Sequence, residues 1–243
     1  MAKYRVRKAD SYGHAVGILM LDYQGPFIPG DVGNASTYDY PVLYKVVKGL
    51  TFDRVCAGDP ECAPLIIEAA KELEAHGVRA ISSDCGFLVQ YQSHVRDAVK
   101  VPVLMSSLLQ IPFMSAMFDP KRPIGCVTAS RRSLGNQVLE LAGIKSDINV
   151  VIGGMEDQPH FADAILGGGE VLDSDLIEQE TVNCALELQE RHPNMSSILI
   201  ECSMLPPYSK AVQDATGLPV FDFISMIDYM QAGTTRRRYE GLY

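Results

Sequence analysis

"ISSDCGFLVQY" occupies residues 81–91, and "ILIECSMLPPY" occupies residues 198–208. In each stretch an apolar run, typical of a buried β-strand, breaks off at an acidic residue that a cysteine follows at once. The acid–cysteine pairs are Asp84–Cys85 and Glu201–Cys202. The recurrence indicates that one structural unit is duplicated in this chain.

Residues around the two cysteines match at the same spacing. A shift of 117 positions pairs identical or similar residues on both sides of the two cysteines. A shift of 108 positions aligns residues 16–17 with residues 124–125. The pairs at the first shift are Asp84/Glu201, Cys85/Cys202, Leu88/Leu205, Tyr91/Tyr208, Val95/Val212, Asp97/Asp214, Ala98/Ala215, Pro102/Pro219 and Val103/Val220. We therefore expect two lobes with a common plan.

Apolar, β-rich runs alternate with helical patterns along most of the chain, which predicts an α/β fold with mainly parallel sheets flanked by helices. The expected strands are residues 15–21, 78–83, 101–105, 123–129, 148–154, 196–201 and 218–222. The expected helices are 62–77, 90–99, 107–118 with a break near Pro112, 131–143, 175–192 and 210–215. We assign residues 1–104 plus 222–243 to a first lobe and 105–221 to a second, pseudo-symmetric lobe, with the active site in the cleft between them.

Both matched cysteines are predicted at the carboxyl end of a strand and before a helix. Ligands of parallel α/β sheets bind at such strand ends, and a helix N-terminus lowers the pKa of a thiol. If the lobes face each other, Cys85 and Cys202 lie on opposite walls of one cleft. One thiolate can then remove a proton from a carbon next to a carboxylate while the other thiol returns a proton to the opposite face. The remaining cysteines are expected in the core.

Several other residues are candidates for substrate contact, each with a structural alternative. Asp84 and Glu201 could hold an ammonium group or tune the thiols, or could face away into structural hydrogen bonds. The Gly- and Pro-rich stretch 21–34 is expected to form a loop over the cleft, although turn formation explains most of its composition. The candidates in this stretch are Asp22 and Tyr23. Four hydroxyl residues could bind a substrate carboxylate or, alternatively, cap helices: Ser83, Thr128, Ser130 and Ser203.

Composition excludes several classes of partner. Thirty acidic against 21 basic residues give a net charge of −9, which argues against nucleic acid and anionic membranes. No apolar stretch approaches the roughly 20 residues that span a bilayer, and the N-terminal sequence lacks a signal-peptide pattern. We expect a cytoplasmic protein with reduced thiols. The cysteines and histidines show no zinc spacing, so no metal is expected.

The duplicated strand–cysteine–helix unit, "PIGCVTASRRS" at 123–133, "ECSMLPPY" and "GLPVFD" together make nearly the whole chain resemble the cofactor-independent aspartate/glutamate racemase superfamily. The resemblance implies two similar lobes, Cys85 and Cys202 as the acid/base pair, and a small carboxylate substrate. It implies a homo-oligomer. It implies no cofactor, neither pyridoxal phosphate nor a metal.

The residues after the two cysteines depart from the pattern of amino-acid racemases. Those enzymes usually have Asn-Thr after the first cysteine and Thr followed by His or Glu after the second. Here Gly86-Phe87 and Ser203-Met204 take these places, and the resemblance makes such neighbours substrate-binding residues. A less polar acid, or a ring such as a hydantoin, is compatible with this departure.

Three classes of function stay open at this point. The first is a racemase or epimerase acting next to a carboxylate through two cysteines. The second is a cis–trans isomerase, or a decarboxylase, of a small dicarboxylic acid on the same scaffold. Decarboxylases of the superfamily use one thiol, so the intact pair counts against them. The third is a non-catalytic protein that binds small acids.

Overall fold

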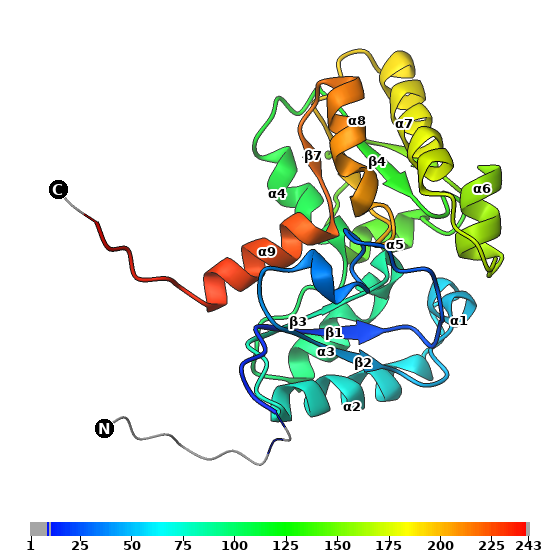
Figure 1. The fold of residues 1–243 in the computed structure, drawn as a ribbon. Coiled ribbons are helices and arrows are strands. Elements are labelled where there is room, and N and C mark those ends of the chain that lie inside the picture. The colour runs from blue at the N-terminus through cyan, green and yellow to red at the C-terminus, as the bar shows by residue number, and fades with distance from the viewer. Residues whose placement is uncertain (1–8, 10, 242–243) are drawn as a thin grey trace.

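Two separate parallel sheets carry the fold, one in each half of the chain (Figure 1). The computed structural model describes residue 9 and residues 11–241. The first sheet has the strand order β2-β1-β3, and the second has the order β5-β4-β6-β7. Their bounds are β1 Val16–Met20, β2 Val42–Val46, β3 Ala80–Ser83, β4 Ile124–Thr128, β5 Val150–Gly154, β6 Ser197–Ile200 and β7 Val220–Phe221.

The strand registers confirm the duplication. In the first sheet Val16 pairs with Val42 and with Ala80. In the second sheet Ile124 pairs with Val150 and Ser197. The shift of 108 positions therefore carries β1 and β2 onto β4 and β5, and the shift of 117 carries β3 onto β6. The α/β architecture with two similar lobes is the one the sequence predicts.

Helices cover both sheets because their apolar faces repeat with helical spacing. On the first sheet, α2 (Cys62–Ala75) buries Ile66, Ala70 and Leu73. It ends at Ala75, and Gly77 beyond its C-cap has a φ of +81°, a backbone conformation that favours glycine. The other helices are α1 Phe52–Cys56, α3 Gln92–Ala98, α4 Ile111–Ser115, α5 Asn136–Leu141, α6 Pro159–Phe161, α7 Ser174–Arg191, α8 Ser209–Thr216 and α9 Phe223–Thr234.

Short turns of helix follow several strands. The 3-10 turn η2 (Gly86–Tyr91) comes after β3, and η5 (Pro206–Tyr208) comes after β6. Further turns are η1 Ala35–Thr37, η3 Ser107–Gln110 and the π-turn η4 Ala162–Leu166. η2 and η5 occupy equivalent places after the two matched cysteines, so the repeat extends beyond the strands.

The last helix, α9, returns to the first sheet. Its buried side chains Phe223, Met226, Ile227 and Met230 belong to the same apolar cluster as residues of β1 and β3. Figure 1 shows α9 between the two halves of the molecule, beside the first sheet. The lobe boundaries given above, 1–104 plus 222–243 and 105–221, stay a prediction, and this packing agrees with them.

Residues 101–105 do not form the strand that their sequence predicts. They contribute a single bridge between Ile81 and Val103. Pro102 has no N–H to donate to a sheet ladder, and the side chain of Gln92 bonds both the Val103 carbonyl and the Met105 N–H, at 2.9 and 2.8 Å. Local bonds thus replace a further strand pairing. Conversely, the sequence did not predict β2, whose residues are half-buried rather than fully apolar.

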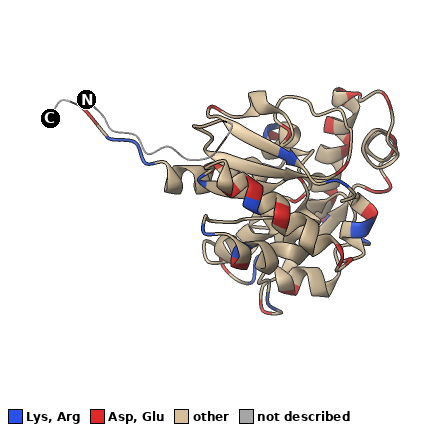
Figure 2. Ribbon diagram, turned by 90° about the horizontal axis from the view of Figure 1, so that it is seen from below, with Lys and Arg blue, Asp and Glu red and all other residues tan. Residues whose placement is uncertain are grey.

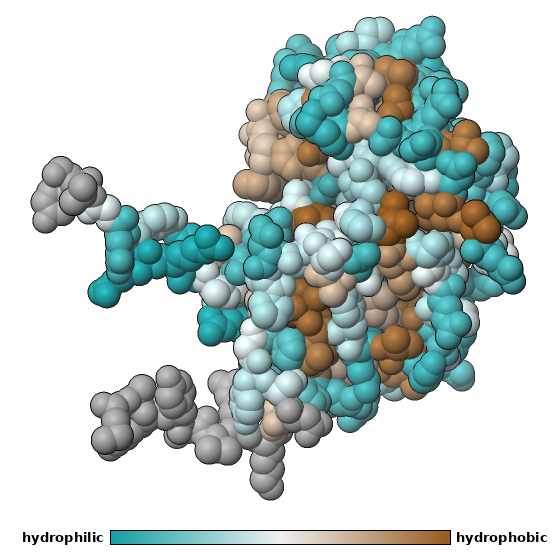
Figure 3. Space-filling view, in the orientation of Figure 1, coloured by the Kyte–Doolittle hydropathy of each residue, from teal (hydrophilic) through white to brown (hydrophobic). Residues whose placement is uncertain are grey.

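Charged and apolar residues are mixed over the surface. Figure 2 shows basic residues scattered among more numerous acidic ones, with a basic run in the extended segment after α9, where Arg236, Arg237 and Arg238 are exposed. Figure 3 shows apolar side chains reaching the surface in separate groups. No helix in the described part of the chain is long and apolar enough to cross a membrane.

Candidate active site

A pocket of about 120 Å³ lies where the carboxyl ends of the strands of both sheets meet. Its residues from the first half of the chain are Leu21, Tyr23, Phe27, Phe52, Asp84, Cys85, Gly86 and Phe87. Its residues from the second half are Ala129, Ile165, Leu166, Glu201, Cys202, Ser203 and Met204. The two cysteines named from the sequence therefore share one pocket.

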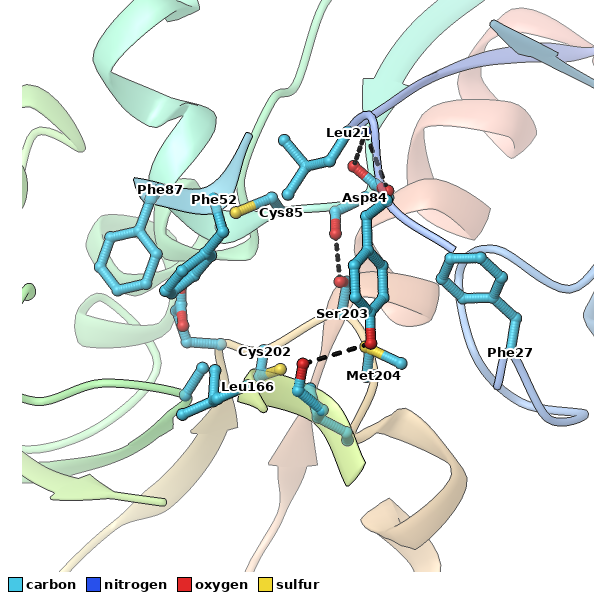
Figure 4. Close-up of a pocket in the computed structure, with 15 residues that line it drawn as sticks. Leu21, Phe27, Phe52, Asp84, Cys85, Phe87, Leu166, Cys202, Ser203 and Met204 are labelled. Carbon is cyan, nitrogen blue, oxygen red and sulfur yellow. Dashed lines mark hydrogen bonds between the residues drawn. The ribbon is translucent and has the colours of Figure 1, made fainter. Parts of the chain in front are cut away.

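Cys85 and Cys202 enter this pocket from equivalent positions. Cys85 follows β3 in extended conformation, with φ −150° and ψ 125°, and the chain then turns into η2. Cys202 stands at the equivalent position after β6, and the two thiol residues are 6% and 7% exposed. Figure 4 shows them on facing walls with open space between. This arrangement lets two thiols approach one small molecule from different sides.

The electrostatic surroundings of the thiols differ from the sequence-based expectation. We expected a helix N-terminus to lower the thiol pKa, but burial raises the pKa of Cys85 well above its ordinary value, and the neighbouring Asp84 and Glu201 raise it further. Burial and Glu201 also raise the pKa of Cys202. The N–H of Phe87 near Cys85 acts in the opposite direction but is weaker. The reason is that each thiol precedes a short 3-10 turn in an apolar pocket instead of a full helix in water.

The acidic residues before the thiols are both buried, and both hold structural bonds. The carboxylate of Asp84 accepts from the backbone N–H of Leu21, at 3.0 and 3.1 Å. The Oε2 of Glu201 accepts from the hydroxyl of Thr128 at 2.7 Å, whereas its Oε1 is buried without a partner among the described residues. Burial raises the pKa of each carboxyl to about 7 against the opposing effect of these bonds.

Two hydrogen bonds tie the walls of the pocket together. The Ser203 hydroxyl donates to the backbone carbonyl of Asp84, so a residue of the second lobe holds the strand end of the first (Figure 4). The hydroxyl of Tyr23 donates to the Ile165 carbonyl at 3.2 Å. Burial, the buried Asp31 and Cys202 raise the pKa of Tyr23. The loop after β1 therefore closes over the pocket, as the stretch 21–34 predicts.

Four of the twelve residues proposed from the sequence lie outside the lining. Asp22 instead bonds Lys48 and the N–H of Gly49, both at 2.9 Å. The other three are hydroxyl residues with protein partners. The hydroxyl of Ser83 donates to the Met105 carbonyl, and that of Thr128 donates to the Glu201 carboxylate. The hydroxyls of Ser130 and Ser133 are hydrogen-bonded to each other. The other eight (Tyr23, Asp84, Cys85, Gly86, Phe87, Glu201, Cys202, Ser203) line the pocket, and their roles toward a substrate stay predictions.

Seven lining residues were not proposed from the sequence: Leu21, Phe27, Phe52, Ala129, Ile165, Leu166 and Met204. Met204 and Leu21 adjoin proposed residues, so their position next to a strand end was a usable signal. Phe52 in α1 and Leu166 in η4 come from segments with no pattern that connects them to the cysteines. Their place follows from tertiary packing alone.

The pocket combines aromatic walls with acidic groups. Tyr23, Phe27, Phe52 and Phe87 line it, with Phe52 and Phe87 in edge-to-face contact at 5.9 Å between ring centroids. Lys, Arg and His are missing from its lining. The described residues include no group of three His, Cys, Asp or Glu that could hold a metal ion. The walls therefore suit a cationic or apolar group.

Comparison with known proteins places the chain in a family. No family model matches it. It is 35% identical over 226 residues to a dimethylsulfoniopropionate lyase from Durusdinium sp. clade D, covering 90% of this chain and 74% of that protein. The chain belongs to the family of the dimethylsulfoniopropionate lyases. It is also 36% identical over 228 residues to dimethylsulfoniopropionate lyase 3 of Emiliania huxleyi, but spans 59% of that protein's length.

Solved structures of racemases and of a decarboxylase share the fold of this chain. An allantoin racemase from Klebsiella pneumoniae matches with a TM-score of 0.63 at 17% identity, over 94% of this chain and 96% of that one. Unliganded arylmalonate decarboxylase matches with a TM-score of 0.60 at 15% identity, over 93% and 95%. At these identities the likeness is one of fold, and it confirms the two-lobed α/β fold that the sequence predicts.

Proposed function

We propose that the chain is a lyase that cleaves a propionate carrying a cationic leaving group on its β-carbon. Dimethylsulfoniopropionate, named for its relatives, is the proposed substrate. The observation that carries the proposal is the pocket itself: two thiols face each other between aromatic walls, and the lining has no basic side chain. Amino-acid dicarboxylates would be poorly matched to such walls, because their second carboxylate would meet Asp84 and Glu201.

The chemistry begins with the step that the two-cysteine scaffold suits. A thiolate takes a proton from the carbon next to the carboxylate. The electron pair of that C–H bond becomes the new carbon–carbon double bond, and the C–S bond breaks with its electrons going to sulfur. The products are acrylate and neutral dimethyl sulfide, and the proton stays on the cysteine until solvent accepts it.

The aromatic walls serve the leaving group. Tyr23, Phe27, Phe52 and Phe87 present ring surfaces on which a sulfonium can rest, and a desolvated cation over an aromatic face gains about 2 kcal/mol. The same walls keep water from the thiolate, and they accept dimethyl sulfide, which is apolar, once it forms. Tyr23 is fixed in this wall by its bond to the Ile165 carbonyl.

The intact cysteine pair favours one second candidate. Racemisation or epimerisation at a carbon next to a carboxylate needs an acid/base group on each face, and Cys85 and Cys202 supply such groups from facing walls. It shares the first step with elimination and differs in the fate of the carbanion. Elimination follows where a good leaving group is present, and reprotonation follows where it is not.

One experiment separates these outcomes. The protein is incubated in D₂O with dimethylsulfoniopropionate and, separately, with single enantiomers of small amino and hydroxy acids. Nuclear magnetic resonance then follows acrylate, dimethyl sulfide and deuterium at the α-carbon. The lyase proposal expects acrylate and dimethyl sulfide in equal amounts. Deuterium uptake with loss of optical activity, and no acrylate, would support the racemase instead.

Cysteine variants assign the base. Cys85→Ser and Cys202→Ser replace a thiol by a hydroxyl of much higher pKa, and the variant that lacks the base is expected to lose about 10²-fold to 10⁴-fold in kcat. Cys184→Ser is the matched control, since Cys184 is 5% exposed in α7 and outside the pocket. Full turnover in both pocket variants would rule out thiol catalysis.

A further inference from the structure

The carboxyl group of Glu201 lines the pocket with one oxygen that has no hydrogen-bond partner. Glu201 follows β6 directly and is 1% exposed. Its Oε2 accepts from the Thr128 hydroxyl at 2.7 Å, whereas its Oε1 is buried and unpartnered among the described residues. A buried polar atom without a partner is rare in native proteins and calls for an explanation.

The unpartnered Oε1 lies where the two lobes meet at the pocket wall. A Cβ built on Gly86 would come within 1.7 Å of Oε1. Gly86 also lines the pocket and follows Cys85, and Glu201 itself precedes Cys202. The carboxyl group of the second lobe therefore reaches the strand ends that carry both thiols, and the missing side chain at position 86 leaves room for it.

Asp84, the other buried acid of the lining, differs from Glu201 in its partners. It is 8% exposed, and both of its oxygens accept from the backbone N–H of Leu21, at 3.0 and 3.1 Å. The negative charge of Asp84 is therefore stabilised by a backbone donor on each oxygen. Of the two carboxyl groups in the lining, Glu201 is the one with an oxygen left over for a ligand.

The pocket lining holds acidic groups without a positive charge to balance them. The titratable groups near Glu201 are thiols from four elements, Cys56 of α1, Cys85 after β3, Cys126 of β4 and Cys202 after β6, and Glu201 raises the pKa of each. The lining contains no Lys, Arg or His. A positive charge in this pocket must therefore come with the ligand.

We propose that Glu201 is the counter-ion of the ligand and determines its specificity: its carboxylate faces the cationic group of a zwitterion, a sulfonium or quaternary ammonium joined by a short chain to a carboxylate. Such a cation has no N–H to donate, so charge attraction from Oε1 and contact with the aromatic rings hold it. The same positive charge lowers the pKa of the nearby thiols. The inference deepens the proposed function and rests on it for the cationic end of the ligand.

Two probes of the same shape test this without turnover. 3-(Trimethylammonio)propionate carries a permanent positive charge, and 4,4-dimethylpentanoate has a carbon in place of the nitrogen and is neutral at that end. Isothermal titration calorimetry at pH 8 measures the affinity of each probe, and nuclear magnetic resonance checks that the probe is unchanged afterwards. The wild type should bind the ammonium probe at least about tenfold more tightly than the neutral-ended probe.

A charge-removing variant assigns this preference to Glu201. Glu201→Gln keeps the size of the side chain and an acceptor for the Thr128 hydroxyl but cannot ionise. It should bind the ammonium probe about tenfold more weakly than the wild type and the neutral-ended probe equally well, whereas a merely structural role would weaken both. Glu180→Gln is the matched control, because Glu180 is 8% exposed but bonds His160 and Phe161 outside the pocket lining.

Proton release supplies a second measurement, on the wild type itself. Burial raises the pKa of Glu201 to about 7, and a bound cation favours the ionised carboxylate. Binding of the ammonium probe at pH 7 should therefore expel a proton, which titrations in two buffers of different ionisation enthalpy detect. The neutral-ended probe should expel none. Affinity for the ammonium probe should rise from pH 6 to pH 8, and Asp84→Asn should keep most of this rise and of the proton release.

The inference is overturned if both probes bind the wild type equally, if Glu201→Gln weakens both alike, or if Asp84→Asn causes the larger loss. Circular dichroism shows whether each variant is folded. Should Glu201→Gln fail to fold, proton release that persists in Asp84→Asn supports the inference, and release that disappears there overturns it. A preference for the ammonium probe without acrylate formation would leave the counter-ion and remove the lyase, and acrylate formation with equal probe binding would do the reverse.

Discussion

At residue 86, glycine is required by a neighbouring carboxyl group and not by backbone conformation. Gly86 is absent from the glycines with positive φ, yet a Cβ there would meet Glu201 at 1.7 Å. The sequence could place Gly86 next to a thiol, because it follows Cys85 directly. It could not show why glycine stands there, since the atom that needs the space is 115 positions away.

Gly86→Ala should therefore damage both stability and turnover. The methyl group must displace Glu201 or the backbone after Cys85, which costs about 1–3 kcal/mol of unfolding free energy for an overpacked site. Urea unfolding and the acrylate assay measure the two effects. Gly233→Ala is the control: it lies in α9 with no described atom within 4 Å of its added Cβ, and alanine should stabilise the helix by about 0.5–1 kcal/mol. Equal stability of the two variants would contradict the close packing at Gly86.

At the scale of elements, the ends of β3 and β6 are joined across the lobes. The Ser203 hydroxyl donates to the carbonyl of Asp84, and the N–H of Val32 donates to the Ser203 carbonyl at 3.3 Å. The sequence pattern predicted both strands, which are buried along their whole length, and it placed a cysteine after each. It could not predict this link, because a serine after a strand serves equally well as a helix cap or a substrate ligand.

Ser203→Ala should loosen this junction. The variant leaves the Asp84 carbonyl without its donor in a buried place, which costs about 1–3 kcal/mol of unfolding free energy. The lobes should then hold the two thiols less firmly, so kcat should fall further than KM rises. Ser36→Ala is the control, since the Ser36 hydroxyl bonds Asn34 at the exposed surface, and a change there should stay within about 0.5 kcal/mol. If both serine variants unfold at the same urea concentration, the hydrogen bond from Ser203 to Asp84 does not contribute to stability.

At the scale of the whole molecule, the sequence predicted two similar lobes and a cleft between them, because the same strand–cysteine–helix pattern occurs in both halves of the chain. The sequence did not predict the aromatic and acidic character of the pocket. Phe52 begins helix α1 and Leu166 ends the π-turn η4, and packing alone brings them to the thiols. The homo-oligomer implied by the family resemblance stays a prediction. Phe113 and Tyr229, 61% and 71% exposed with ring centroids 6.3 Å apart, are the apolar surface to examine for it.

Buried acids should make the whole protein more stable in mild acid than in mild alkali. Burial raises the pKa of Asp31 to about 8 and those of Asp84 and Glu201 to about 7, whereas unfolded carboxyls titrate near 4. Between these values the folded state binds more protons than the unfolded state, so stability is full below about pH 4 and falls as pH rises toward 8. Each group contributes at most about 1.4 kcal/mol per pH unit.

Urea unfolding at pH 5, 6, 7 and 8 measures this slope. Asp31→Asn keeps the oxygen that accepts from the Gly33 N–H, at 2.7 Å, but cannot ionise, so its stability should fall less steeply over the same range. The partly exposed Asp22 and Asp59 do not interfere, because their pKa values lie below the ordinary value and their effects fall below pH 4. A wild type whose stability is flat or rises from pH 5 to pH 8 would mean that these three carboxyls are ionised in the folded protein.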